Sequence, residues 1–91
     1  MRDPAALRSA YYVFAGRFAA KEAVFKALGT GLSGGLHWTD AEVRNKPSGQ
    51  PYLILSGPAQ ELADRLRVEA ILVSMSHSRQ YAIAQVLLLG R

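Results

Sequence analysis

The stretch RFAAKEAVFKALGTG, at positions 17–31, constrains the fold of this chain more than any other. Large apolar side chains recur at helical intervals through it and before it, and small residues stand between them. Gly29 follows the last of them, at a place where a glycine in the left-handed conformation commonly ends a helix. The pattern predicts one long helix that lies close against a sheet. The large apolar positions are Leu7, Tyr11, Phe14, Phe18 and Phe25, and the small ones are Ala15, Gly16, Ala19, Ala20, Ala23 and Ala27.

Three charged residues lie on this predicted helix. Glu22 and Lys26 are four positions apart, and Lys21 adjoins Glu22. Side chains at a spacing of four project from the same side of a helix, here near its C-terminal end. The spacing alone leaves two interpretations open. One is an exposed ion pair of the kind common on helices, and the other is a carboxylate and an ammonium that serve a site.

Turn formers and periodicity divide the first half of the chain into three elements. Pro4 suits the first turn of a helix, so we expect the long helix over residues 4–28. Residues 37–44 alternate as a strand does. The turn formers of residues 45–50 join it to a short apolar strand at 52–55, which predicts a β-hairpin.

The second half of the chain predicts a short helix and a second hairpin. Pro58 begins the helix, which we expect to end near Val68. Its expected buried side comprises Leu62 and Leu66, with Ala59 and Ala63 beside them. Residues 71–76 and 81–88 are then two strands joined by 77–80. The expected fold class is α+β, with one long helix packed on an antiparallel β-sheet and a second short helix, in a single domain over residues 1–91.

Composition excludes several classes of protein. The chain has 91 residues and 49% hydrophobic residues, which is enough for one modest core. It contains no cysteine, so it has no disulfide framework and no thiolate metal site, and the cytoplasm is the default compartment. The N-terminus has no long apolar region of the signal-peptide type. The most apolar stretch, residues 81–89, is far shorter than the roughly 20 residues that span a bilayer, so we expect no membrane segment.

The net charge of +4 favours an anionic partner without identifying it. Nucleic acid, a nucleotide cofactor and an acidic protein all fit this charge. The basic residues are dispersed, and the aromatic residues follow helix-core spacing instead of alternating with them on a strand. Both features make a nucleic-acid platform the weaker interpretation.

Four separated segments resemble one family. RFAAKEAVFKALGTG, SGQPYL, SMSH and YAIAQV are similar, in order and spacing, to motifs of the 4′-phosphopantetheinyl transferases of the small holo-acyl-carrier-protein synthase type. The resemblance extends over nearly the whole chain. It implies transfer of the phosphopantetheine group from coenzyme A to a serine of an apo acyl carrier protein, with Mg²⁺ and with release of 3′,5′-ADP. It also implies a homotrimer with active sites at the subunit boundaries.

The resemblance assigns roles to residues of the long helix. Glu22 matches the glutamate that binds the metal, and it also helps to deprotonate the incoming serine through water. Lys26 matches the lysine that contacts the phosphates and stabilises the departing group. Gly29, which follows them, is included among the expected coenzyme A contacts. Hard oxygen ligands without thiolates suit Mg²⁺.

Two further segments are expected to contact coenzyme A. Ser76 and His77 match a segment that reaches the coenzyme A phosphates, often from the adjoining subunit. Ser48, Gly49 and Pro51 match a turn beside the adenine. The family has asparagine and lysine where this chain has Ser48 and Gln50, so backbone contacts at Gly49 are the ones expected to persist.

One departure from the family pattern leaves a second hypothesis open. Family members begin with an apolar strand whose G-x-D segment supplies the second metal ligand, and this chain starts after it. Asp3 does not replace that aspartate, because it precedes a helix and is not in a buried strand. A shortened chain of this kind could instead be a non-catalytic or split assembly module, which binds coenzyme A or a partner chain without turnover.

Overall fold

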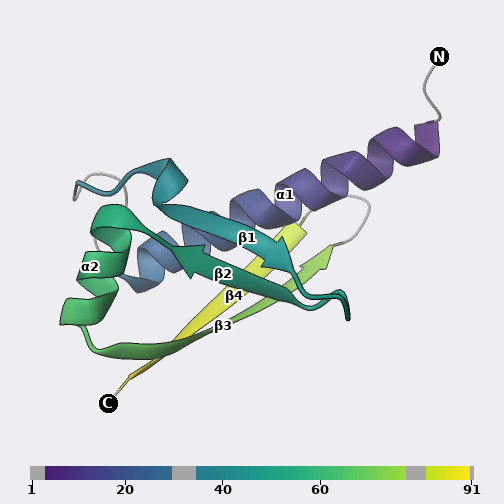
Figure 1. The fold of residues 1–91 in the computed structure, drawn as a ribbon. Helices are drawn as coiled ribbons and strands as arrows, with labels where there is room; N and C mark the ends of the chain where they lie inside the picture. The colour runs from purple at the N-terminus through teal and green to yellow at the C-terminus, as the bar shows by residue number, and fades with distance from the viewer. Residues whose placement is uncertain (1–3, 30–34, 78–81, 91) are drawn as a thin grey trace.

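The computed structural model describes residues 4–29, 35–77 and 82–90. In chain order its elements are α1 (Pro4–Ala27), the 3₁₀ turn η2 (Trp38–Asp40), β1 (Ala41–Asn45), β2 (Pro51–Leu55), α2 (Gly57–Arg65), β3 (Val68–His77) and β4 (Ala82–Gly90). Figure 1 shows α1 running the length of the molecule beside two β-hairpins, with α2 at one end. The expected α+β class is confirmed.

The long helix α1 ends where its sequence predicts. Gly29 has a φ of +90°, which is the left-handed conformation expected at a helix C-cap. Its backbone N–H donates to the carbonyl of Lys26 at 3.0 Å. The end of the helix is therefore fixed by local backbone geometry.

Small residues bring α1 close to the strands. Ala20 and Val24 are fully buried, and a Cβ added to Gly16 would lie 3.5 Å from the sulfur of Met75 on β3. The large residues behave differently, since Phe25 is buried but Phe14 is 68% exposed and lies outside the core. The expected apolar stripe therefore does not belong to a single buried face, because close packing on the strands favours small side chains.

The first hairpin forms as expected, but it begins later in the chain. β1 and β2 pair antiparallel, with Val43 opposite Leu53. The predicted strand over 37–44 is wrong in its first half, where residues 38–40 form η2. The physical reason is Asp40, which is 7% exposed and accepts a hydrogen bond from the backbone N–H of His37 at 3.2 Å. That bond closes a turn which an extended strand cannot contain.

Helix α2 is shorter than its apolar pattern suggests. It ends at Arg65, and Val68 already belongs to β3, so the expected end near residue 68 is wrong. Arg67 has a φ of +59° and turns the chain into the strand. As a result Leu66 is 50% exposed and does not join the buried side, whereas Ala59 and Ala63 are buried as expected.

The second hairpin pairs β3 with β4 antiparallel, with Leu72 opposite Leu87. The expected connection, residues 77–80, falls mainly outside the described residues. The four strands form two separate two-stranded ladders in place of one sheet, with β2 lying beside β3. The core lies between α1, α2 and the two hairpins, with partly buried side chains of β3 and β4 packed against its buried members. These buried members are Ala20, Val24, Phe25, Leu28, Leu36, Ala41, Val43, Leu53, Leu55, Ala59 and Ala63. No helix in the described residues has the length and apolar character needed to cross a bilayer.

Candidate functional site

A cavity of about 250 Å³ opens where α1, the turn between β1 and β2, and β3 meet. Three of its lining residues, Gly49, Pro51 and Ser76, come from the two motifs, SGQPYL and SMSH, in which the sequence analysis expected coenzyme A contacts. The full lining is Val13, Gly16, Arg17, Asn45, Gly49, Pro51, Met75 and Ser76. It combines apolar walls with a guanidinium, an amide, a hydroxyl and backbone groups. Such a mixture suits a ligand with a flat apolar part and an anionic part.

The turn that forms one wall is held by backbone hydrogen bonds. The N–H of Gly49 donates to the carbonyl of Lys46 at 2.8 Å, and the N–H of Lys46 donates to the carbonyl of Gln50 at 2.9 Å. Gly49 has a φ of +91°, which a glycine adopts without steric cost. The turn therefore presents its backbone, with no bulky side chain at Gly49, to the cavity.

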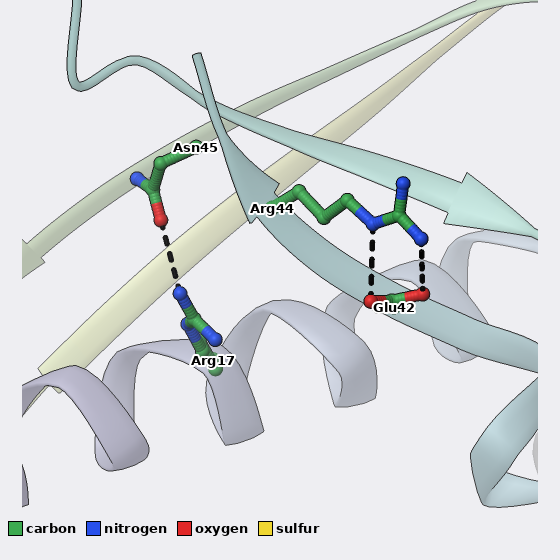
Figure 2. Close-up of polar contacts among 4 residues, drawn as sticks. All are labelled: Arg17, Glu42, Arg44 and Asn45. Atoms are coloured by element: carbon green, nitrogen blue, oxygen red, sulfur yellow. Dashed lines mark hydrogen bonds and ion pairs between the residues drawn. The ribbon is translucent and has the colours of Figure 1, made fainter. Parts of the chain in front are cut away.

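Arg17 and Asn45 link the helix to this turn, and sequence reasoning missed both of them. Arg17 Nη2 donates to Asn45 Oδ1 at 3.1 Å, as Figure 2 shows, and Asn45 Nδ2 donates to the carbonyl of Gly49 at 3.0 Å. The sequence did contain a signal for Arg17, because it is the first residue of the motif RFAAKEAVFKALGTG and directly follows Gly16. No local pattern marks Asn45, which reads as an ordinary turn residue.

The two residues expected to do the chemistry lie elsewhere on α1. Glu22 and Lys26 are both exposed on the helix, and neither lines the cavity. In the part of the chain that the structure describes, Arg44 forms an ion pair with Glu42, and Glu22 and Lys26 form none with each other. An exposed Glu22–Lys26 ion pair is therefore not formed. Within one chain, the structure separates these two side chains from the cavity.

The remaining nominated residues lie near the helix end and the hairpins. Gly29 caps α1 and is exposed. Ser48 is exposed in the β1–β2 turn, where its Oγ accepts a hydrogen bond from the backbone N–H of Gln50 at 3.4 Å. His77 is the last residue of β3, and its backbone pairs with that of Ala82.

Lys21 faces a different direction from its neighbour Glu22. Its Nζ lies 4.3 Å from the centroid of the Trp38 ring, which is a cation–π contact. Partial burial there lowers the pKa of Lys21, and the nearby Glu42 carboxylate opposes that shift. Trp38 also packs against Phe18 and Phe25, with ring centroids 4.9 and 6.0 Å away. Lys21 thus belongs to an aromatic cluster that joins α1 to η2.

A charged pair borders the Arg17–Asn45 contact. Arg44 Nε donates to Glu42 Oε1 at 3.0 Å and Arg44 Nη2 donates to Glu42 Oε2 at 3.2 Å (Figure 2). This two-point hydrogen bond, together with the Arg44 charge, lowers the pKa of Glu42. Arg17 donates to Asn45, and its charge also contributes, less than Arg44, to the lowered pKa of Glu42.

Glu22 is the carboxylate to which the family resemblance assigns a magnesium ion, and the described residues provide no ready-made metal cage around it. No group of three His, Cys, Asp or Glu residues that could hold a metal occurs among them. Glu22 is an exposed helical carboxylate, which is a hard oxygen donor. Mg²⁺ in proteins commonly takes one or two carboxylates, several waters and substrate phosphates. A single carboxylate fits that mode of binding and does not fit an all-protein cage.

Comparisons with known proteins identify what the chain is similar to. A family model described as the 4′-phosphopantetheinyl transferase superfamily matches residues 2–86. The holo-[acyl-carrier-protein] synthase of Desulforudis audaxviator is 48% identical over 85 residues, which are 93% of this chain and 64% of that protein. The chain thus spans less than two thirds of the length of this relative.

Two solved structures resemble the fold. The Helicobacter pylori holo-[acyl-carrier-protein] synthase in complex with coenzyme A has a TM-score of 0.75 and 30% sequence identity, over 97% of this chain and 76% of that one. The Plasmodium yoelii acyl carrier protein synthase with ADP bound has a TM-score of 0.72 and 39% identity, over 81% of this chain and 55% of that one. Both were solved with a ligand that contains an adenine nucleotide.

Proposed function

Because the chain belongs to the 4′-phosphopantetheinyl transferase superfamily, we propose that it transfers 4′-phosphopantetheine from coenzyme A to a serine of an apo acyl carrier protein. The observation that supports this most directly is the cavity in which Gly49, Pro51 and Ser76 meet Arg17. These residues come from three motifs far apart in the sequence. A guanidinium beside backbone groups and apolar walls is suited to the nucleotide end of coenzyme A.

The proposed reaction is a displacement at phosphorus. The serine oxygen of the carrier protein attacks the β-phosphorus of coenzyme A, a new P–O bond forms, and the bond to 3′,5′-ADP breaks. The serine proton passes to water near Glu22, and the charge left on 3′,5′-ADP is stabilised by Lys26. Positioning and charge stabilisation account for most of the catalysis of phosphoryl transfers, which suits a site that offers cations and a carboxylate without a nucleophile of its own.

Glu22 is the residue proposed to hold Mg²⁺. When bound, the ion would neutralise charge on the coenzyme A phosphates. Glu22 contributes one hard carboxylate oxygen from a rigid helix, and its exposure leaves room for the waters that Mg²⁺ retains. We expect the metal to bind weakly without coenzyme A and more tightly with it.

Several copies of the chain are proposed to complete the site as a trimer. The outward face of β3 and β4 exposes large apolar side chains, namely Leu72, Ile83, Leu87 and Leu89. A patch of this kind is characteristic of surfaces covered by another protein. Since Glu22 and Lys26 lie outside the cavity of their own chain, an assembly could bring them to the cavity of a neighbour.

Intact-mass analysis of the carrier protein tests the proposal. Apo carrier protein, coenzyme A and Mg²⁺ are incubated with the chain, and a gain of one phosphopantetheine per carrier is expected. Glu22→Gln should abolish the Mg²⁺-dependent gain. Glu61→Gln is the matched control, because it alters an exposed glutamate of α2 away from the cavity and should leave the gain unchanged. Equal gains with both variants would refute the role of Glu22.

A non-catalytic module of the same fold is the second candidate. The observation in its favour is that the described residues contain no group of three His, Cys, Asp or Glu side chains that could hold a metal ion. Calorimetric titration with coenzyme A separates the two functions. Binding of coenzyme A without any mass gain on the carrier would support the module and count against the transferase.

A further inference from the structure

We propose that Asn45 is a positioning residue that fixes the nucleotide-binding wall of the cavity to helix α1. Asn45 is the last residue of β1 and lies directly before the turn that carries Gly49. Its amide makes two hydrogen bonds in opposite directions, one with the helix and one with the turn. Because the cavity is a nucleotide site only under the function proposed above, this role depends on that function.

The first half of the bridge joins the strand to the helix. Asn45 Oδ1 accepts a hydrogen bond from Arg17 Nη2 at 3.1 Å, although the two residues are 28 positions apart in the chain. Figure 2 shows Arg17 rising from α1 toward the end of β1. This contact sets the rotamer of the long Arg17 side chain, which would otherwise sample many conformations in solvent. The guanidinium is thereby held at the mouth of the cavity.

The second half joins Asn45 to the turn. Asn45 Nδ2 donates to the carbonyl of Gly49 at 3.0 Å. Gly49 has no side chain with which to anchor itself, and a Cβ added to it would meet no atom within 4 Å. Its backbone orientation therefore depends on hydrogen bonds, and Asn45 supplies the one to its carbonyl. The amide suits this task because it carries an acceptor and a donor on one rigid plane.

The two hydrogen bonds require an amide side chain, because one bond needs an acceptor and the other needs a donor. An aspartate at this position would still accept from Arg17, but it could not donate to the Gly49 carbonyl. An alanine would lose both bonds. Preorganised contacts contribute to affinity because the ligand does not have to order them on binding. We therefore expect Asn45 to affect ligand affinity without contacting the reacting atoms.

Calorimetry with 3′,5′-ADP and with coenzyme A tests the inference on the full chain. Asn45→Ala loses both hydrogen bonds and should weaken binding of both ligands about two- to tenfold, because neither bond is made to the ligand itself and only the preorganisation of the cavity wall is lost. Gln60→Ala is the matched control, because Gln60 is also an exposed amide and donates to Asp64 Oδ1 at 2.8 Å, on α2 and away from the cavity lining. It should leave both affinities unchanged. Equal affinities for Asn45→Ala and the unaltered chain would overturn the role of Asn45 alone.

Backbone relaxation of the turn gives a readout independent of any ligand. The ¹H–¹⁵N heteronuclear NOE of Ser48, Gly49 and Gln50 should fall in both Asn45→Ala and Asn45→Asp, since neither can donate to the Gly49 carbonyl. An unchanged NOE in Asn45→Asp would overturn the bridge to the turn. Absence of nucleotide binding by the unaltered chain is a different result, because it would overturn the proposed function and the ligand role together.

Discussion

Replacing Asp40 is expected to destabilise the fold through helix α2. Asp40 Oδ2 accepts hydrogen bonds from two backbone N–H groups, His37 at 3.2 Å and Ala59 at 3.3 Å. Ser56 occupies the N-cap position of α2, yet its side chain makes no capping bond. A carboxylate 19 residues away from Ala59 therefore performs the capping, and it also holds η2 against the helix.

The size of the effect follows from the burial of the two donors. Ala59 is fully buried, so Asp40→Ala leaves its N–H without a partner, which costs about 1–3 kcal/mol. His37 is exposed, and water can replace its bond at a cost of about 0.5–1 kcal/mol. Loss of a negative charge at a helix N-terminus adds roughly 0.3–1 kcal/mol. We expect the free energy of unfolding to fall by about 2–5 kcal/mol in total, against roughly 5–14 kcal/mol for a chain of this length.

Asp40→Asn is the discriminating variant. Both bonds end on one oxygen, so an asparagine with its carbonyl oxygen in that place keeps them and loses only the charge. We expect it to cost about 1 kcal/mol or less. Urea denaturation followed by fluorescence measures both variants, because Trp38 is the only tryptophan of the chain and lies in η2. The reasoning fails if Asp40→Ala lies within about 0.5 kcal/mol of the unaltered chain, or if both variants lose the same amount.

Two further outcomes are expected. Leu87→Lys should reduce the mass measured by light scattering to that of one chain, because Leu87 is 56% exposed on the apolar face of β3 and β4. Leu66→Lys is the control, at a site that is 50% exposed beyond α2, and it should leave the mass unchanged. Equal masses for both variants and the unaltered chain would contradict assembly through β3 and β4. Arg44→Met should raise the pKa of Glu42 measured by NMR titration, because Arg44 lowers it in the folded chain. Because the pKa of Glu42 is lowered in the folded chain, its pairing with Arg44 stabilises the fold at a pH above the ordinary glutamate pKa. That stabilisation is lost as the pH falls through the pKa of Glu42 in the folded chain, so the stability difference between Arg44→Met and the unaltered chain should shrink in acid. A Glu42 pKa that does not move would contradict the pairing.

The sequence alone determined the elements whose signals are local. The end of α1 at Gly29 and the turn at Gly49 both depend on a φ that glycine adopts readily, so a single residue type is enough to predict them. The antiparallel hairpin of β1 and β2 follows from two apolar strands and the turn between them. Four motifs in order also predicted the family, which the family model over residues 2–86 confirms.

Local patterns misplaced the residues whose environment comes from elsewhere in the chain. Asp40 fits the alternating pattern of a strand, but its carboxylate accepts a hydrogen bond from the backbone N–H of Ala59 in α2, and residues 38–40 form η2 instead. Phe14 and Phe25 fit one apolar helical pattern, but Phe25 is covered and Phe14 is not. Helical spacing predicts which residues share a side of the helix, but it does not predict which part of that side the rest of the fold covers.

Only the tertiary structure decided the composition of the cavity. Arg17 and Asn45 meet across 28 positions, and neither residue carries a local signal for the other. The separation of the four strands into two ladders likewise has no local signal in the sequence. The physical reason is that a helix cap or a turn depends on the backbone angles of a few neighbouring residues. A contact between distant residues depends instead on how every intervening element packs, and that information is spread over the whole chain.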